Sequence, residues 1–157
     1  MIYFKEMKLT IDSEDSMRAF GERLGRALEG GECIELIGDV GSGKTTLTKG
    51  IAAGLGIDDT VQSPTFTINR TYDAPNGIRL SHYDFYRLSD PGIMSDELAE
   101  SLDEPRTVIV IEWGDIVGSV LPEDHMKVTF DSPEETVRTL HIEVTGDKSS
   151  RLAEALV

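Results

Sequence analysis

The sequence predicts an α/β protein in which helices flank a mixed sheet, with antiparallel hairpins in the second half of the chain. Three observations predict this class. A helix-like segment after Ser13 is followed by a strand-like run at Cys33–Ile37 and then by a second helix-like segment. The run Thr107–Ile111 is continuously apolar or β-branched, which is typical of a strand buried in a parallel sheet. Asn76 and Gly77 separate two strand-like segments and favour a tight hairpin turn.

The elements follow from local patterns along the chain. Asp12 or Ser13 can cap a first helix whose apolar residues recur every three or four positions, and Gly30–Gly31 ends it. We expect further helices at Lys44–Leu55, Asp90–Leu102 and Ser149–Leu156. We expect strands at Ile2–Leu9, Cys33–Ile37, Phe66–Asp73, Ile78–Tyr86, Thr107–Ile111, Met126–Phe130 and Val137–Val144. Strands alternate with helices early and form hairpins later, so the sheet should be mixed, with its parallel part near the loop Gly38–Gly43.

Length and composition restrict the class of protein. The 157 residues, 39% of them hydrophobic, suggest one domain spanning 1–157. Lys and Arg number 15 against 29 Asp and Glu, a net charge of −14, which argues against this chain holding a nucleic-acid backbone by itself. The single cysteine, Cys33, excludes an intramolecular disulfide and is expected to be a core residue. We see neither a membrane-spanning run nor a secretory signal, and we expect a cytoplasmic protein.

A phosphate-binding loop is the most informative motif. Residues 38–45 fit G-x-x-x-x-G-K-S/T at every fixed position, between a strand-like run and a helix. Glycines let backbone N–H groups surround phosphate oxygens, Lys44 supplies a positive charge, and Thr45 offers a hydroxyl to Mg²⁺. The pattern predicts a P-loop NTPase-like fold that binds ATP and Mg²⁺. The predicted loop contacts are Gly38, Asp39, Val40, Gly41, Ser42, Gly43, Lys44, Thr45 and Thr46.

Two acidic residues at strand ends are candidates for the rest of the site. Asp84 lies near the end of one predicted strand, and Glu112 directly follows the buried run that ends at Ile111. An acid in such a place is costly unless it meets water, a metal or a charge, so both are candidate metal ligands. Trp113 is a candidate neighbour of the nucleotide, whereas His82 is expected to be a hydrogen-bonded structural histidine.

Taken in order, these blocks resemble the bacterial TsaE (YjeE) family, small ATPases needed to make threonylcarbamoyladenosine in tRNA. The resemblance covers nearly the whole chain. It is carried by the phosphate loop with Thr46, by Ser-Pro-Thr-Phe at Ser63–Phe66, by His82–Arg87 with Phe85 in place of the family's leucine, and by Ile-Glu-Trp at Ile111–Trp113. Leu121-Pro122 and Arg138 also match. Gly114 departs from the pattern, because the family often has proline there.

The resemblance implies a role for each matching residue. Lys44, Asp84, Glu112 and Thr65 would be catalytic, with Thr65 on a switch loop, and Thr45, Glu112 and Asp84 would surround Mg²⁺. Trp113 would lie close to the nucleotide, and Glu14 and Arg138 would border the adenine. The implied partners are TsaB- and TsaD-like proteins, which would hold tRNA within the assembly, and no membrane is involved.

The sequence leaves two alternative functions open. A small-molecule or nucleotide kinase shares the phosphate loop but usually carries an arginine-rich lid, and the basic residues here are dispersed. A nucleotide-dependent interaction switch with little turnover is the other alternative. A GTPase is disfavoured because no Asn-Lys-x-Asp motif occurs. No arginine finger lies close to the loop, so we expect slow hydrolysis without partners, unless Arg70 or Arg87 acts in cis.

Overall fold

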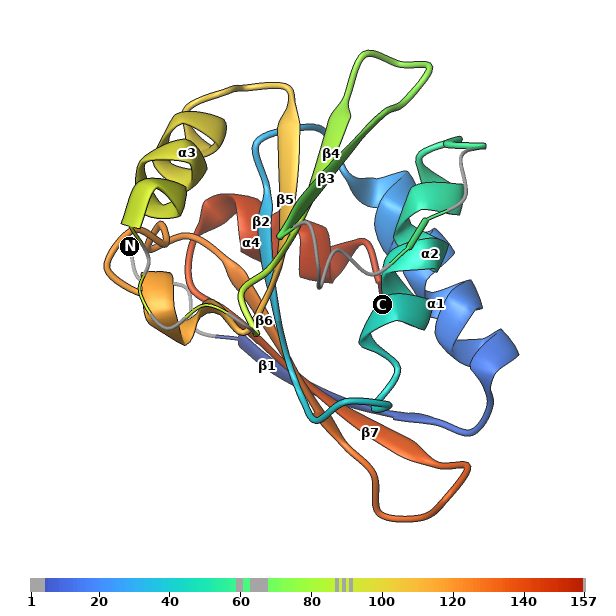
Figure 1. Ribbon diagram of the computed structural model, residues 1–157. Coiled ribbons are helices and arrows are strands. Elements are labelled where there is room, and N and C mark those ends of the chain that lie inside the picture. The colour runs from blue at the N-terminus through green and yellow to red at the C-terminus, as the bar shows by residue number, and fades with distance from the viewer. Residues whose placement is uncertain are drawn as a thin grey trace.

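A seven-stranded mixed sheet runs through the middle of the protein, with helices on both faces (Figure 1). The computed structural model describes residues 5–58, 61–62, 68–86, 88, 90 and 92–156. The strands in these ranges are β1 (Lys5–Ile11), β2 (Cys33–Ile37), β3 (Asn69–Asp73), β4 (Arg79–Asp84), β5 (Thr107–Glu112), β6 (Met126–Asp131) and β7 (Arg138–Val144). The helices are α1 (Glu14–Ala27), α2 (Lys44–Gly54), α3 (Gly92–Leu102), α4 (Asp147–Glu154) and the 3₁₀ helix η1 (Gly114–Val117).

The strand order β1-β7-β6-β2-β5-β4-β3 confirms the predicted mixed sheet. The four central strands β6, β2, β5 and β4 are parallel, while β3 pairs with β4 and β7 with β6 as antiparallel hairpins. Gly77, with φ of +87°, closes the first hairpin, as the Asn-Gly signal predicts. The pairing of β1 with β7 joins the two ends of the chain and was not predicted, because no local pattern specifies it.

The predicted boundaries that fall on described residues differ from the observed ones by a few residues at most, whereas the strand starts predicted at Ile2 and Phe66 lie outside the described residues. Ser13 is the cap of α1, where its Oγ accepts a hydrogen bond of 3.0 Å from the N–H of Ser16. The first strand continues to Ile11 instead of ending at Leu9. It does so because Leu9, Thr10 and Ile11 pair with β7, a long-range contact that local propensity does not reveal.

The two faces of the sheet bury separate apolar clusters. One cluster packs α1, α2 and α4 against the sheet and includes Leu24, Leu47, Ile51 and Leu152. The other lies under α3 and η1 and includes Leu98, Val117 and Cys33. Burial raises the pKa of the Cys33 thiol to about 12, so it remains protonated and packs as a small apolar residue, as predicted.

Helices α1 and α2 cross at backbone contact, which sets the position of everything that α2 carries. The contact is made by two pairs of glycines four residues apart, Gly21 with Gly25 on α1 and Gly50 with Gly54 on α2. A Cβ added at Gly50 would lie 2.3 Å from the carbonyl oxygen of Arg18, and one at Gly21 would lie 2.5 Å from that of Leu47. Larger residues would therefore hold the helices apart.

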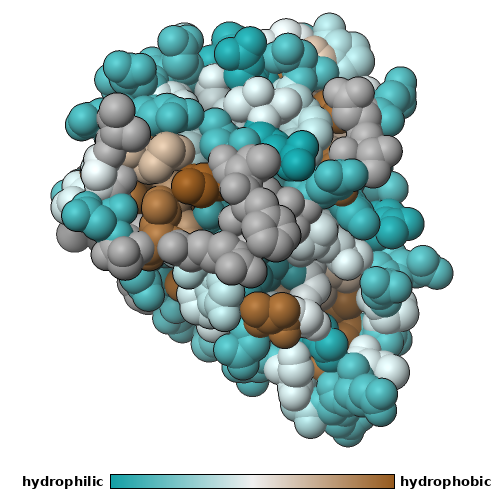
Figure 2. Space-filling view, in the orientation of Figure 1, coloured by the Kyte–Doolittle hydropathy of each residue, from teal (hydrophilic) through white to brown (hydrophobic). Residues whose placement is uncertain are grey.

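The face of the molecule in Figure 2 is mostly hydrophilic, with a few small hydrophobic patches, as the acidic composition suggests. None of the helices in the described part of the chain is long and apolar enough to cross a bilayer.

Candidate nucleotide-binding site

The phosphate loop joins the end of β2 to the start of α2. Gly41 and Gly43 have φ of +83° and +109°, left-handed conformations in which a side chain would be strained. This curvature places the loop at the N-terminus of α2, where unpaired N–H groups and the helix dipole favour an anion. The hydroxyl of Ser42 is buried within the loop and has no hydrogen-bond partner among the described residues. The loop therefore fits a phosphate group.

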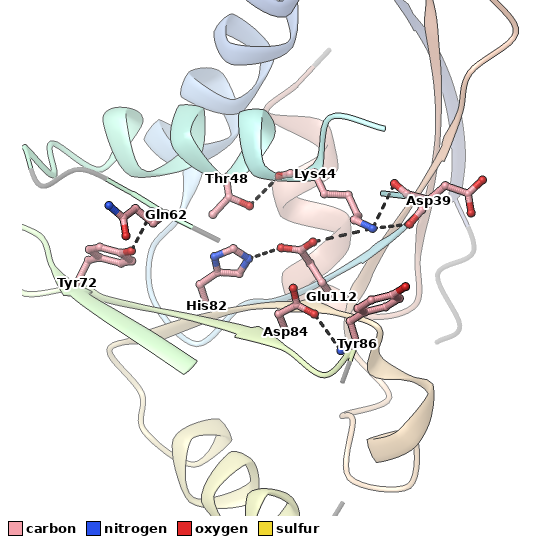
Figure 3. A network of polar contacts seen from close by, with 10 residues as sticks. Asp39, Lys44, Thr48, Gln62, Tyr72, His82, Asp84, Tyr86 and Glu112 are labelled. Atoms are coloured by element: carbon pink, nitrogen blue, oxygen red, sulfur yellow. Dashed lines mark hydrogen bonds and ion pairs between the residues drawn. The ribbon is translucent and has the colours of Figure 1, made fainter. Parts of the chain in front are cut away.

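Lys44 begins α2 and is almost fully buried. Its ammonium group donates to the carbonyl of Gly38 and, at 3.4 Å, to the carbonyl of Asp39. It also lies 3.9 Å from Oε1 of Glu112 (Figure 3). The centre of the Trp113 ring is 4.7 Å away from the same ammonium group. One positive charge is thus surrounded by acceptors that phosphate oxygens can replace.

Two carboxylates lie side by side at the carboxyl edge of the parallel strands. Asp84 ends β4, Glu112 ends β5, and the two residues are direct partners in the parallel ladder. Both are nearly buried. Oδ1 of Asp84 accepts a 2.9 Å hydrogen bond from the N–H of Tyr86, and Oε2 of Glu112 lies 2.6 Å from Nε2 of His82. The edge that holds them is the usual ligand-binding edge of α/β sheets.

The residues predicted to hold Mg²⁺ fit its chemistry. Asp84, Glu112 and the hydroxyl-bearing Thr45 line the same cleft. Mg²⁺ in nucleotide sites is usually bound through one or two carboxylates together with phosphate oxygens and water, and these three side chains supply such a set. In the described ranges, no three His, Cys, Asp or Glu side chains are arranged to hold a metal ion by themselves.

Trp113 lies at the turn between β5 and η1 in a left-handed conformation, with φ of +58°. A bulky residue adopts this conformation rarely and at a cost of roughly 1–3 kcal/mol. The turn brings the indole ring to 4.8 Å from the ring of Tyr86, and both rings are partly exposed. The strained turn therefore holds an aromatic pair beside Lys44.

Gly114, the departure from the family pattern, has a local reason. A Cβ at this position would lie 2.9 Å from Oε2 of Glu35 and 3.1 Å from the side chain of Ile111. Glu35 is buried on β2 and lies 3.6 Å from Nε2 of His125. The nearby carboxylate of Glu35 raises the pKa of His125 above its ordinary value, because it favours the charged imidazolium. Glycine thus leaves room for the buried Glu35.

A cleft of about 900 Å³ brings most of the predicted site together. The predicted residues that line it are Glu14, Val40, Gly41, Ser42, Gly43, Lys44, Thr45, Thr46, Asp84, Glu112, Trp113 and Arg138. Gly38 and Asp39 lie at the base of the loop, where their carbonyls accept from Lys44. Thr65, with the rest of Ser63–Phe66, lies outside the described residues, as does Arg87.

Arg138 connects the β6–β7 hairpin to the phosphate loop. Its guanidinium donates to the carbonyl of Ser42 at 3.2 Å and to that of Gly41 at 3.4 Å. It also donates to three carbonyls of the hairpin turn, those of Glu134, Glu135 and Val137. Arg138 also lines the cleft, while its position beside the adenine stays a prediction. Its contacts with the loop are a structural link that the sequence did not indicate.

Several cleft residues were not predicted, namely Asp12, Ser13, Met17, Tyr86, Glu135 and Thr136. Tyr86 had an available signal, because it lies two residues after Asp84 in the His82–Arg87 block. Met17 lies on the buried apolar side of α1, and an apolar residue at helical spacing indicates core packing only. Glu135 and Thr136 lie in a hairpin turn whose approach to α1 depends on the sheet order, so no local signal marked them.

Comparisons with known proteins show which proteins this chain is similar to. The family model described as threonylcarbamoyl adenosine biosynthesis protein TsaE matches residues 11–140. The TsaE protein of Streptomyces coelicolor is 38% identical over 133 residues, which cover 83% of this chain and 90% of that protein. The TsaE protein of Bacillus subtilis is 32% identical over 155 residues, covering 97% and 94%. The crystal structure of YdiB from Bacillus subtilis superposes with a TM-score of 0.80 at 27% identity, covering 98% of this chain and 95% of that one.

Proposed function

Because the chain belongs to the TsaE family of threonylcarbamoyladenosine biosynthesis, we propose that it binds Mg-ATP at the phosphate loop and hydrolyses it in support of this tRNA modification. The observation that carries the proposal is the register of β4 and β5. It places Asp84 and Glu112 side by side in the cleft that Lys44 and the phosphate loop also line.

Each residue has a chemical task in this proposal. The loop N–H groups and Lys44 bind and orient the phosphates, and their positive charge stabilises the charge that develops on the transferred phosphoryl group. Thr45, Glu112 and Asp84 would hold Mg²⁺, which when bound neutralises phosphate charge. Glu112 or Asp84 also orients the attacking water by accepting its hydrogen bond. Trp113 and Tyr86 form an aromatic pair that lines the cleft beside Lys44 and would border the bound nucleotide.

We further propose that TsaB- and TsaD-like proteins are the partners and that tRNA is held by their assembly in the cytoplasm. The net charge of −14 supports the proposal that the partners, and not this chain, hold the tRNA, because an acidic chain repels the tRNA backbone but can bind basic protein surfaces. Partner docking would accelerate hydrolysis by adding a charge or ordering a loop. We expect slow turnover by the chain alone.

The test is phosphate release from ATP by the purified chain, alone and with its TsaB and TsaD counterparts. Glu112→Gln, which nearly preserves shape but removes the charge, should retain nucleotide binding and lose Mg-dependent hydrolysis. Hydrolysis by Glu112→Gln at the wild-type rate would show that Glu112 is a structural strand-end acid. Nucleotide binding with no phosphate release, even with partners, would favour an interaction switch, and phosphorylation of an acceptor would favour a kinase.

A further inference from the structure

The buried histidine on β4, His82, contacts the side chain of Glu112 in the candidate site. We propose that His82 is a positioning residue that holds the carboxylate of Glu112 in the orientation needed for Mg-ATP hydrolysis. The inference rests on the proposed function and adds to it a residue that does not itself contact the nucleotide.

The geometry of the pair is specific. Nε2 of His82 lies 2.6 Å from Oε2 of Glu112, and their exposed fractions are 0% and 3% (Figure 3). His82 and Asp84 are two residues apart on β4, so their side chains point to the same face of the sheet. Glu112 lies on the neighbouring strand opposite Asp84. The contact is therefore set by the register of two parallel strands.

The two carboxylate oxygens of Glu112 have different neighbours. Oε2 is used by His82, while Oε1 faces Lys44 at 3.9 Å. An ionised carboxylate only accepts hydrogen bonds, so the contact places a proton on Nε2 of His82. Nδ1 of His82 has no hydrogen-bond partner within the described ranges, so the polar contact of the ring there is the one with Glu112. Oε1 is left for a metal ion or water.

His82 acts through Glu112 and not on the substrate. The described residues that line the cleft include Glu112 and Asp84 but not His82, whose side chain is fully buried. A general base must reach the proton that it removes, directly or through one water. Residues behind a metal-binding carboxylate fix its orientation, and their loss typically costs about 10- to 100-fold in metal affinity or activity. The position of His82 behind Glu112 corresponds to the role of a residue that orients a metal-binding carboxylate, and not to that of a general base.

Three substitutions separate positioning from simple core packing. In His82→Gln the amide nitrogen lies about where Nε2 lies, so the donor to Glu112 is retained. His82→Asn is polar but too short to reach Oε2, and His82→Leu fills space without a donor. Tyr83→Phe is the matched control, because it removes a hydrogen bond of 2.9 Å to Ser101 from the adjacent residue on the opposite face of β4.

The experiment has two readouts, measured on the full chain. The first is steady-state hydrolysis of ATP with the partner proteins, at varied ATP and Mg²⁺. The second is the emission of Trp113 on titration with ADP, with and without Mg²⁺, which requires no turnover. Thermal unfolding of each variant identifies any that fail to fold, and comparison of His82→Asn with His82→Gln remains decisive if His82→Leu does not fold.

We expect His82→Leu and His82→Asn to lower kcat and to weaken the Mg-dependent part of ADP binding, each by roughly 10- to 100-fold. KM for ATP and metal-free ADP binding should change little. His82→Gln should recover most of both losses, and Tyr83→Phe should match the wild type. Wild-type kcat and Mg²⁺ dependence in folded His82→Asn would overturn the inference, as would a folded His82→Gln as impaired as His82→Asn. Failure of the wild type to bind or hydrolyse ATP would instead overturn the proposed function.

Discussion

Gly50→Ala tests whether the close crossing of α1 and α2 determines stability. The added Cβ would lie 2.3 Å from the carbonyl oxygen of Arg18, about 1.1 Å short of the 3.4 Å at which ordinary contact begins. The obstructing atom belongs to a helix backbone and cannot rotate away as a side chain can. The helices must therefore separate, and a gap of about 0.5–1 Å loses a quarter to a half of the dispersion energy of the atoms that face it.

The expected size follows from two opposing effects. Overpacking of this kind costs up to about 3 kcal/mol. Alanine regains about 1 kcal/mol in a helix interior, because it loses less backbone entropy than glycine on folding. We expect a net loss of about 2 kcal/mol in the free energy of unfolding. For a protein of this size that is a fall of roughly 4–8 °C in Tm. Because α2 begins at Lys44, nucleotide binding should weaken as well.

Urea denaturation followed by circular dichroism measures the change. Lys49→Ala is the matched control, because Lys49 precedes Gly50 on the exposed side of α2 and its loss should change stability by less than about 0.5 kcal/mol. A Gly50→Ala protein as stable as the wild type, with the control unchanged, would show that the two helices adjust without cost and would refute the reasoning.

Three further predictions concern the site and its surroundings. His125 has a raised pKa in the folded state, so its pairing with Glu35 stabilises fully below about pH 6.5 and is lost as pH rises through the folded pKa. Urea unfolding across that range should show this slope, and an equal slope in His125→Gln would contradict it. Trp113 emission should change on adding ATP or ADP, whereas an unchanged spectrum at saturation would place the indole away from the nucleotide. Arg138→Lys should weaken nucleotide binding several-fold, because a single ammonium group cannot replace the two guanidinium nitrogens that donate to the carbonyls of Gly41 and Ser42. Undiminished affinity in the same fluorescence titration would show that these hydrogen bonds do not support the loop.

Much of the fold and of the site could be predicted from the sequence, because the signals are local. The phosphate loop depends on glycines and a lysine at fixed spacing, and β2 has the predicted bounds Cys33–Ile37. The Asn-Gly turn and the cap at Ser13 are also set by a few neighbouring residues. In each case the local backbone conformation depends on the preferences of the residues within it, so it can be predicted from the sequence of that segment alone.

Only the tertiary structure decided which of these parts meet. The register of β4 and β5 brings Asp84 opposite Glu112, and the same pairing brings His82 to Glu112. The helical periodicity of α1 marks its apolar face, but glycines carry no apolar signal, so the backbone contact at Gly21 and Gly50 could not be predicted. Such contacts join residues tens of positions apart, and their free energy depends on the packing of both elements and not on the local preference of either one.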